Sequence, residues 1–335
     1  MSTKGYNTYH GRSNAKKTVA TIALLLIIIG AVGYLVVQNY IVYDDAGQAH
    51  LELLNRQKKE EVKPELSQDE VTIEFVEPPE KWLPVQELHA TQLPEGALKR
   101  DPADVLRDAD EAMLIDVKRI NGALTYAVGT EVPEQVEMGK PETAENLKTL
   151  LADDRYTIAH LYTLCDSYFV RAYHDAAFLL KSGDLWYDGE GWAWLDPTDP
   201  NVLGYITALC REYAELGFDE ILLDCFAYPT NGRMETIAIE EGTDRTAVLQ
   251  SFAESIRNAL PENVVLSVVI RDGKNAESGL SAEMIAACFD RVYIAPNADA
   301  EGLLRGLPED YDRNVRVVQM AYQKPTSGSY VLMTQ

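Results

Sequence analysis

The sequence predicts an α/β fold from residue 82 onward, a parallel (β/α)8 barrel, on three observations. Short apolar runs alternate with longer segments that have helical spacing. In the clearest unit, Gly217 ends a predicted helix and Glu220–Phe226 is typical of a strand covered on both faces. About eight such strands can be counted, which is the number that closes a barrel of this kind.

The first eighty residues have a different character. Residues 19–37 are almost wholly apolar, which is long enough for a membrane span of about 20 residues. Basic residues without any acid precede this run: Lys4, Arg12, Lys16 and Lys17. The positive-inside rule therefore predicts a cytoplasmic tail over 1–18, a transmembrane signal anchor over 19–37 and an extracytoplasmic remainder. A cleaved signal peptide is the alternative, although the apolar run is longer than a usual signal core.

Beyond the predicted anchor, residues 38–81 are acidic and contain prolines, which predicts an extended linker, and residues 82–335 form the predicted barrel domain. The formal net charge is −23, and the part beyond the basic tail is more acidic still. Such a surface argues against nucleic acid as a partner. It suits a neutral or cationic ligand, or it serves solubility alone.

Patterns for cofactor, metal and thiol chemistry are absent from the sequence. No Gly-x-Ser-x-Gly elbow and no Gly-rich phosphate loop occurs, so no cofactor is predicted. The histidines form no His-Glu-x-x-His pair, so no metal site is predicted, and the domain's His89, His160 and His174 are interpreted as packing residues. No Cys-x-x-Cys pair occurs either, which leaves buried thiols or a disulfide between Cys165 and Cys225.

The first half of the domain contains a turn at Asn121-Gly122 that leads into residues 123–126. A long aromatic loop, residues 166–196, is expected at the catalytic face, and a helix capped by Asp199 runs from Pro200 to Gly217. The remaining elements predicted here are the strands Val85–Ala90, Ala112–Lys118 and Tyr156–Leu164 and the helices Ala103–Ala109 and Thr143–Leu151.

The second half, after a loop over 231–242, continues the alternation of helix and strand. It predicts the helices Asp244–Leu260, Ala282–Cys288 and Ala300–Leu304, and the strands Val264–Ile270, Arg291–Ala295, Val315–Met320 and Val331–Thr334. No helical pattern follows the last strand. The prediction is therefore a barrel that can be incomplete at its C-terminus.

Two motifs resemble a known family. The segment Trp192-Ala193-Trp194-Leu195-Asp196-Pro197, followed by Gly217-Phe218-Asp219-Glu220-Ile221-Leu222-Leu223-Asp224, is similar to the W-x-D-P and GFDEIQFDYVRFP motifs of the bacterial putative glycoside hydrolase domain family. Leu114–Lys118, with Gly122 and Tyr126, resembles that family's IDVKDDxGxxxY signature. The resemblance implies a TIM-type barrel that cleaves glycosidic bonds, with a polysaccharide or cell-wall glycan as its partner. The arginine of the DYVRFP motif is replaced here, since residues 224–229 are Asp-Cys-Phe-Ala-Tyr-Pro.

Glycoside hydrolysis uses two carboxyl groups, and parallel barrels carry their chemistry at the carboxyl ends of strands. Asp224 is therefore the first catalytic candidate, and pairing with a neighbouring Lys or Arg is its alternative role. Its predicted catalytic partners are Asp116 and Asp166, with Asp272 as a further possibility. Glu220 shares the face of Asp224 but lies near the other end of the strand, which predicts a polar residue at the bottom of the barrel.

Side chains for substrate binding are predicted around these carboxylates. Lys118 is expected on the face of Asp116, either orienting a sugar hydroxyl or forming a structural ion pair. Indole rings can stack on pyranose rings. The predicted substrate-binding residues are Lys118, Trp186, Trp192, Trp194 and Arg271. Two functions remain open: a membrane-anchored hydrolase, and a module that binds glycan or cell wall without catalysis.

Overall fold

The computed structural model describes residues 41–43, 49–51, 86–109 and 111–334. The chain divides into two units, residues 1–75 and 76–335. In the first unit, the strands β1 (Ile41–Tyr43) and β2 (Ala49–Leu51) form an antiparallel pair within the segment predicted as a linker. The predicted signal anchor, 19–37, lies outside the described residues. No helix among the described residues is both long and apolar enough to cross a membrane.

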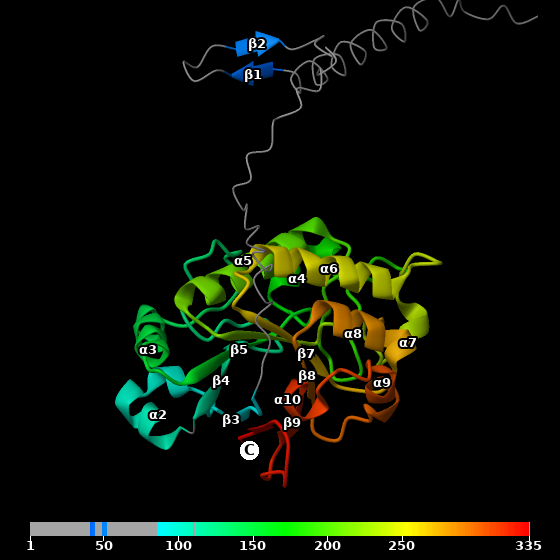
Figure 1. Ribbon diagram of the computed structural model, residues 1–335. Helices are drawn as coiled ribbons and strands as arrows, with labels where there is room; N and C mark the ends of the chain where they lie inside the picture. The colour runs from blue at the N-terminus through cyan, green and yellow to red at the C-terminus, as the bar shows by residue number, and fades with distance from the viewer. Residues whose placement is uncertain (1–40, 44–48, 52–85, 110, 335) are drawn as a thin grey trace, which may run out of the picture. The chain divides into compact units, whose positions relative to one another are not determined.

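The second unit is a closed barrel of eight parallel strands, in the order β10-β3-β4-β5-β6-β7-β8-β9 (Figure 1). The TIM-type barrel predicted from the sequence is thereby confirmed. Its strands are β3 (His89–Gln92), β4 (Ala112–Lys118), β5 (Tyr156–Tyr162), β6 (Glu220–Asp224), β7 (Val265–Ile270), β8 (Arg291–Ile294), β9 (Val317–Ala321) and β10 (Tyr330–Leu332).

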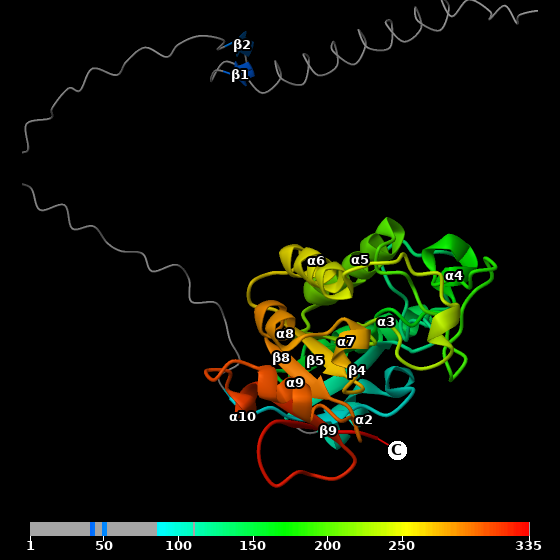
Figure 2. The same cartoon turned by 90° about the vertical axis from the view of Figure 1, so that its right-hand side faces the viewer.

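Helices surround the barrel, with α5 and α6 side by side on one flank and α8 next to α9 on another (Figures 1 and 2). The α-helices are α2 (Pro102–Asp108), α3 (Pro141–Leu151), α4 (Phe169–Ala172), α5 (Pro200–Leu216), α6 (Arg245–Ala259), α7 (Asn275–Ser278), α8 (Ala282–Cys288), α9 (Glu301–Gly306) and α10 (Arg313–Arg316). The 3-10 helices are η1 (Ala97–Lys99), η2 (His174–Ala176) and η3 (Met234–Thr236).

The unit α5–β6, from which the barrel was predicted, forms as expected. The Asp199 carboxylate caps α5 by accepting from the backbone N–H groups of Asn201 and Val202, and Pro200 occupies the first turn. Gly217 ends the helix with φ 102°, a left-handed conformation that glycine adopts without steric cost. All five residues of β6 are buried, in agreement with a strand covered on both faces.

The prediction that the barrel could be incomplete is wrong. Three residues suffice to close it, because β10 pairs in parallel register with β9 on one side and with β3 on the other. The chain reaches β10 through residues 322–329, which contain no helix. The first strand also differs from its prediction: it runs over His89–Gln92 instead of Val85–Ala90.

The barrel interior has three layers. Alternate residues of the strands point inward, so that Leu114, Ile158 and Leu222 meet in an apolar middle layer with Val269. Polar side chains lie at both ends of this layer. The strands that carry these side chains are neighbours in the barrel, in the order β4-β5-β6-β7.

The polar layer at the amino ends of the strands is centred on Glu220, which has no exposed surface. Its carboxylate accepts hydrogen bonds from Arg291 Nη1 at 2.6 Å, Ser267 Oγ at 2.5 Å and the hydroxyls of Tyr156 and Tyr293 at 2.9 and 2.8 Å. Four donors compensate the loss of water around a buried anion. Glu220 is therefore a structural residue at the bottom of the barrel, as its place in the strand predicted.

Removing the Glu220 carboxylate should destabilise the domain strongly. The Glu220→Ala change leaves the Arg291 guanidinium buried without its anion, which typically costs about 3–5 kcal/mol. Urea unfolding followed by circular dichroism measures this loss. Glu262→Ala, on the exposed connection into β7, is the matched control and should change the free energy of unfolding by less than about 0.5 kcal/mol. Equal stability of the two variants would contradict the assignment.

Candidate active site

The polar layer at the carboxyl ends of the strands holds a chain of hydrogen-bonded side chains. Asp116 comes from β4, His160 from β5 and Asp224 from the last position of β6, while Arg271 directly follows β7. Parallel pairing places these positions together: Asp116 is opposite His160, and Asp224 is opposite Tyr162, two residues further along β5. The layer lies at the barrel end where enzymes of this fold carry their active sites.

Asp224 is fully buried and accepts four hydrogen bonds. Arg271 donates from Nε and Nη2 at 2.6 Å each, one to either carboxylate oxygen. The backbone N–H of Cys225 donates at 2.7 Å, and His160 Nε2 lies 2.9 Å away. Although burial alone would raise the pKa of Asp224, the charge of Arg271 and the bond from His160 hold it well below its usual range. Asp224 is therefore an anion with every lone pair occupied.

His160 bridges the two aspartates. Its Nδ1 lies 2.7 Å from Asp116 Oδ1 and its Nε2 lies 2.9 Å from Asp224 Oδ2. A neutral imidazole carries one N–H, so donation to both carboxylates requires the protonated ring. Burial opposes this charge, but the hydrogen bonds from the two aspartates outweigh burial and raise the pKa of His160 to about 9. The interpretation of His160 as a packing residue was therefore wrong.

Asp116 is the accessible carboxylate of the chain. Its side chain is 33% exposed, whereas that of Asp224 is not exposed at all. Gln92 Nε2 lies 3.1 Å from one oxygen of Asp116 and 3.3 Å from the other, and His160 holds the same group from below. One imidazole ring and two hydrogen bonds separate the two aspartates. The separation of the Asp116 and Asp224 carboxyl groups thus falls within the upper limit of about 9.5 Å between the two carboxyl groups that glycoside hydrolysis uses.

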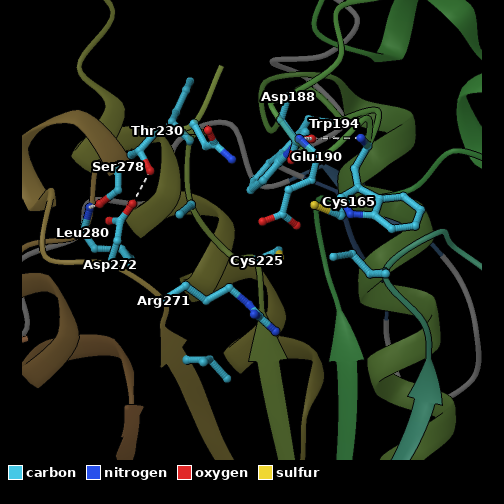
Figure 3. A pocket seen from close by; sticks show the side chains of 16 residues that line it. Cys165, Asp188, Glu190, Trp194, Cys225, Thr230, Arg271, Asp272, Ser278 and Leu280 are labelled. Carbon is cyan, nitrogen blue, oxygen red and sulfur yellow. Dashed lines mark hydrogen bonds between the residues drawn. The ribbon is translucent and has the colours of Figure 1, made fainter. Parts of the chain in front are cut away.

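Two adjoining cavities open over this layer. The first, about 290 Å³, is lined by Arg271, Trp192 and Trp194 and by the loop residues Asp188 and Glu190 (Figure 3). The second, about 240 Å³, is lined by Asp116 and Tyr162. Ile120 borders both, and Arg271 Nη2 of the first cavity donates to the Tyr162 hydroxyl of the second at 3.1 Å. Together they form a cleft above the barrel mouth, of the volume that small-ligand sites have.

Asp166 and Lys118, by contrast, form an ion pair with no exposed surface, 3.0 Å from Nζ to Oδ2. A β-bulge between Asp116 and Lys118 takes Lys118 off the face it was expected to share with Asp116 and toward Tyr205 of α5. The remaining oxygen of Asp166 accepts the backbone N–H groups of Tyr168 and Phe169. Both predicted site residues therefore hold the loop after β5 in place, and neither lines the cleft.

Two of the three predicted tryptophans line the cleft and the third does not. Trp192 and Trp194 line the first cavity, whereas Trp186 is buried and its Nε1 donates to the carbonyl of Arg233 at 3.3 Å. Asp272 also borders this cavity, but its carboxylate accepts from the Thr230 hydroxyl and from the Lys274 backbone N–H.

Four polar residues at this end of the barrel were not predicted as site residues. Tyr162 shares the inward face of β5 with His160, and two-residue alternation could have indicated both. Gln92 carried no comparable pattern, because β3 was predicted too early in the chain. Glu190 belongs to a loop, where periodicity gives no information. The overlooked residues are Gln92, His160, Tyr162 and Glu190.

The candidate site contains cysteine thiols but, among the described residues, no group of metal ligands. All four cysteines are buried, and the thiols of Cys165 and Cys225 border the first cavity. Burial raises the pKa of the Cys165 thiol well above its usual range, which keeps it protonated and unreactive. Within residues 86–109 and 111–334, no three His, Cys, Asp or Glu side chains come together as metal ligands would.

The chain matches the model of the family described as "Putative glycosyl hydrolase domain" over residues 103–292, which include β4 to β7 and the first two residues of β8. This match covers more than half of the chain, so the protein belongs to that family. The resemblance read from the Trp192–Pro197 and Gly217–Asp224 motifs is thereby confirmed. No curated protein matches the chain.

Solved structures with similar folds include glycoside-active proteins. A hypothetical protein from Ruminiclostridium thermocellum is 23% identical (TM-score 0.45), with 54% of this chain and 96% of that chain covered. The PgaB glycoside hydrolase domain from Bordetella bronchiseptica is 13% identical (TM-score 0.47; 74% and 94%). A Paenibacillus cycloisomaltooligosaccharide glucanotransferase is 12% identical (TM-score 0.48), and the chain spans only 38% of its length while 71% of this chain is covered. The family assignment depends on the family match and not on these structures.

The charge on His160 predicts a pH-dependent stability. Its pKa is raised from 6.5 to about 9, so the imidazolium stabilises the fold fully below about pH 6.5 and loses this effect as the pH rises through 9. At 1.36 kcal/mol per pKa unit the loss amounts to roughly 3 kcal/mol. Urea unfolding from pH 6 to pH 10 measures it. The His160→Asn variant should lack this decline, and a wild-type stability that stays level across the range would refute the charged state.

Proposed function

We propose that the protein is an extracytoplasmic glycoside hydrolase, anchored in the cell membrane through residues 19–37, that cleaves a polysaccharide or cell-wall glycan. One observation carries the catalytic part of this proposal. Asp116 and Asp224 lie across a single imidazole ring at the barrel mouth, beside a cleft lined by tryptophans. Membership of the putative glycosyl hydrolase domain family supports the same reaction class.

The proposed roles of the two carboxylates follow from their surroundings. Cleavage of a glycosidic bond passes through an oxocarbenium-like transition state, which a nearby anion stabilises. Asp116 is the anion that substrate can reach, and it faces the cleft beside Tyr162. Asp224 acts through His160, because its own lone pairs are occupied. Trp192, which is partly exposed, offers a ring face on which a sugar ring can stack, and the largely buried Trp194 borders the same cavity.

Asp116→Asn should lower kcat on the cleaved glycan by about 100-fold or more, because the amide cannot carry the negative charge that the transition state requires. The assay measures reducing-sugar release by the full chain from a panel of cell-wall and exopolysaccharide glycans. Asp224→Asn should also reduce kcat, since it removes the anion that orients and charges His160. Glu262→Gln, with the same charge change at the opposite end of the barrel, should retain the wild-type rate.

A module that binds glycan without cleaving it is the second candidate function. The complete burial and fourfold hydrogen bonding of Asp224 favour it, since the carboxylate in the family motif is not open to substrate. The same panel separates the two functions. If the wild-type chain releases no sugar and still binds a glycan by isothermal titration, the hydrolase proposal fails and the binding module replaces it.

The proposed anchoring has its own test. Residues 19–37 are apolar and follow a basic segment, so the wild-type chain should sediment with bacterial membranes, and protease added to spheroplasts should digest its domain. Charged residues at a span's centre cost about 2.5–3.5 kcal/mol each. The double substitution Leu25→Arg and Leu26→Arg should therefore prevent insertion and leave the domain protected. Protection of the wild-type domain would contradict the proposed topology.

A further inference from the structure

Cleavage of a glycosidic bond requires a proton for the departing oxygen, and the hydrogen-bonded chain at the barrel mouth has none to give. Asp224 is held as an anion. His160 is buried, and both of its N–H groups are engaged by carboxylates. The Arg271 guanidinium remains charged in proteins, and burial raises the pKa of the Tyr162 hydroxyl well above its usual range. The proton donor must come from another element.

The cleft contains a further carboxyl group on the loop after β5. Glu190 is exposed and lines the first cavity, and Figure 3 shows its side chain extending from the loop into that cavity, with Arg271 at the cavity's floor. Among the described residues, its carboxylate makes no hydrogen bond and no ion pair. Its oxygens are therefore free to meet a substrate or to carry a proton.

The loop is built to hold this residue in one place. The Asp188 carboxylate accepts the backbone N–H of Glu190 and that of Trp192 at 2.9 Å each, and the indole N–H of Trp194 at 3.0 Å. The backbone of Asp188 also bonds to that of Trp192. A side chain on Gly189 would approach the Asn231 amide to 2.5 Å, so the turn packs closely against the loop after β6. The backbone that carries Glu190 is thus held beside the cavity, and fixing the backbone reduces the cost of positioning its side chain for catalysis.

Other carboxyl groups that line the two cavities are engaged elsewhere. Asp188 accepts the three bonds that shape the turn. Asp272 accepts from the Thr230 hydroxyl and from the Lys274 backbone N–H. Glu95 pairs with Arg119 at 2.6 Å on the rim of the second cavity. Asp116 bonds to Gln92 and His160. Among the described carboxyl groups that line the two cavities, Glu190 alone makes no hydrogen bond or ion pair with the protein.

We propose that Glu190 is the general acid and base of the cleavage reaction, a role that rests on the hydrolase function proposed above. The protonated Glu190 carboxyl gives its proton to the glycosidic oxygen as the bond from that oxygen to the anomeric carbon breaks. The leaving sugar departs with a free hydroxyl, while Asp116 stabilises the positive charge on the anomeric carbon. Glu190, now a carboxylate, takes a proton from the water that adds to this carbon, which restores the starting state.

Glu190→Gln tests the role directly, with the cleaved glycan and an aryl glycoside of the same sugar as substrates. On the glycan kcat should fall by about 100-fold to 10,000-fold. On a dinitrophenyl glycoside, whose leaving group needs no proton, dinitrophenolate should be released at close to the wild-type rate. The basic limb of the pH–rate profile should disappear. Glu262→Gln is the matched control, and Glu190→Asp should restore part of the activity.

Three outcomes would overturn the assignment. In the first, Glu190→Gln keeps the wild-type kcat on the glycan while Asp116→Asn is inactive. The role of Glu190 as general acid and base then fails, and the hydrolase proposal stands. The second is a rise in KM alone for sugars with an amino group, which would make Glu190 a binding residue. The third is the absence of sugar release by the wild type, which overturns both proposals. Because Glu190 is exposed, the variant's Tm should equal that of the wild type.

Discussion

Charge compensation around His160 is the constraint on which the mouth of the barrel depends. Two anions, Asp116 and Asp224, alternate with two cations, His160 and Arg271, and each contact is a hydrogen bond of 2.6 to 2.9 Å. A buried charge is costly unless a partner and good geometry offset the loss of water. Four strands must therefore end in register for any one of these groups to be tolerated. The closed barrel supplies that register.

The family motif contains an arginine that this chain lacks, and Arg271 takes a similar position beside Asp224. In the motif it would follow the aspartate on the same strand, but here Arg271 reaches Asp224 from the end of the neighbouring strand β7. The guanidinium also lies over the Tyr162 ring, 5.1 Å from its centroid, while 44% of its side chain remains exposed to the cleft. One side chain thus neutralises the buried carboxylate and forms part of the surface that a ligand would meet.

Elements whose pattern is local could be predicted from the sequence, and contacts that depend on register could not. The Asp199 cap, the Gly217 stop and the apolar run of β6 are local features, so α5, β6 and the position of Asp224 at a strand end were predictable. The bond from His160 to Asp224 was not predictable, because it depends on the register between β5 and β6. Lys118 shows the same limit: one bulge in β4 moved it from the expected pairing with Asp116 to Asp166. The turn that holds Glu190 arises from side-chain bonds of Asp188, which have no periodicity.

The apolar layer through the middle of the barrel has a consequence for how the protein can change. Glu220 and Asp224 belong to one strand, four residues or about 13 Å apart, and Leu222 lies between them with no exposed surface. Substitutions separated by more than about 7–10 Å without shared partners act additively. We therefore expect substitutions in the upper polar layer to leave the contribution of the lower polar layer to stability unchanged. Substitutions at the mouth can therefore change which ligand the cleft accepts without a loss of stability from the lower layer.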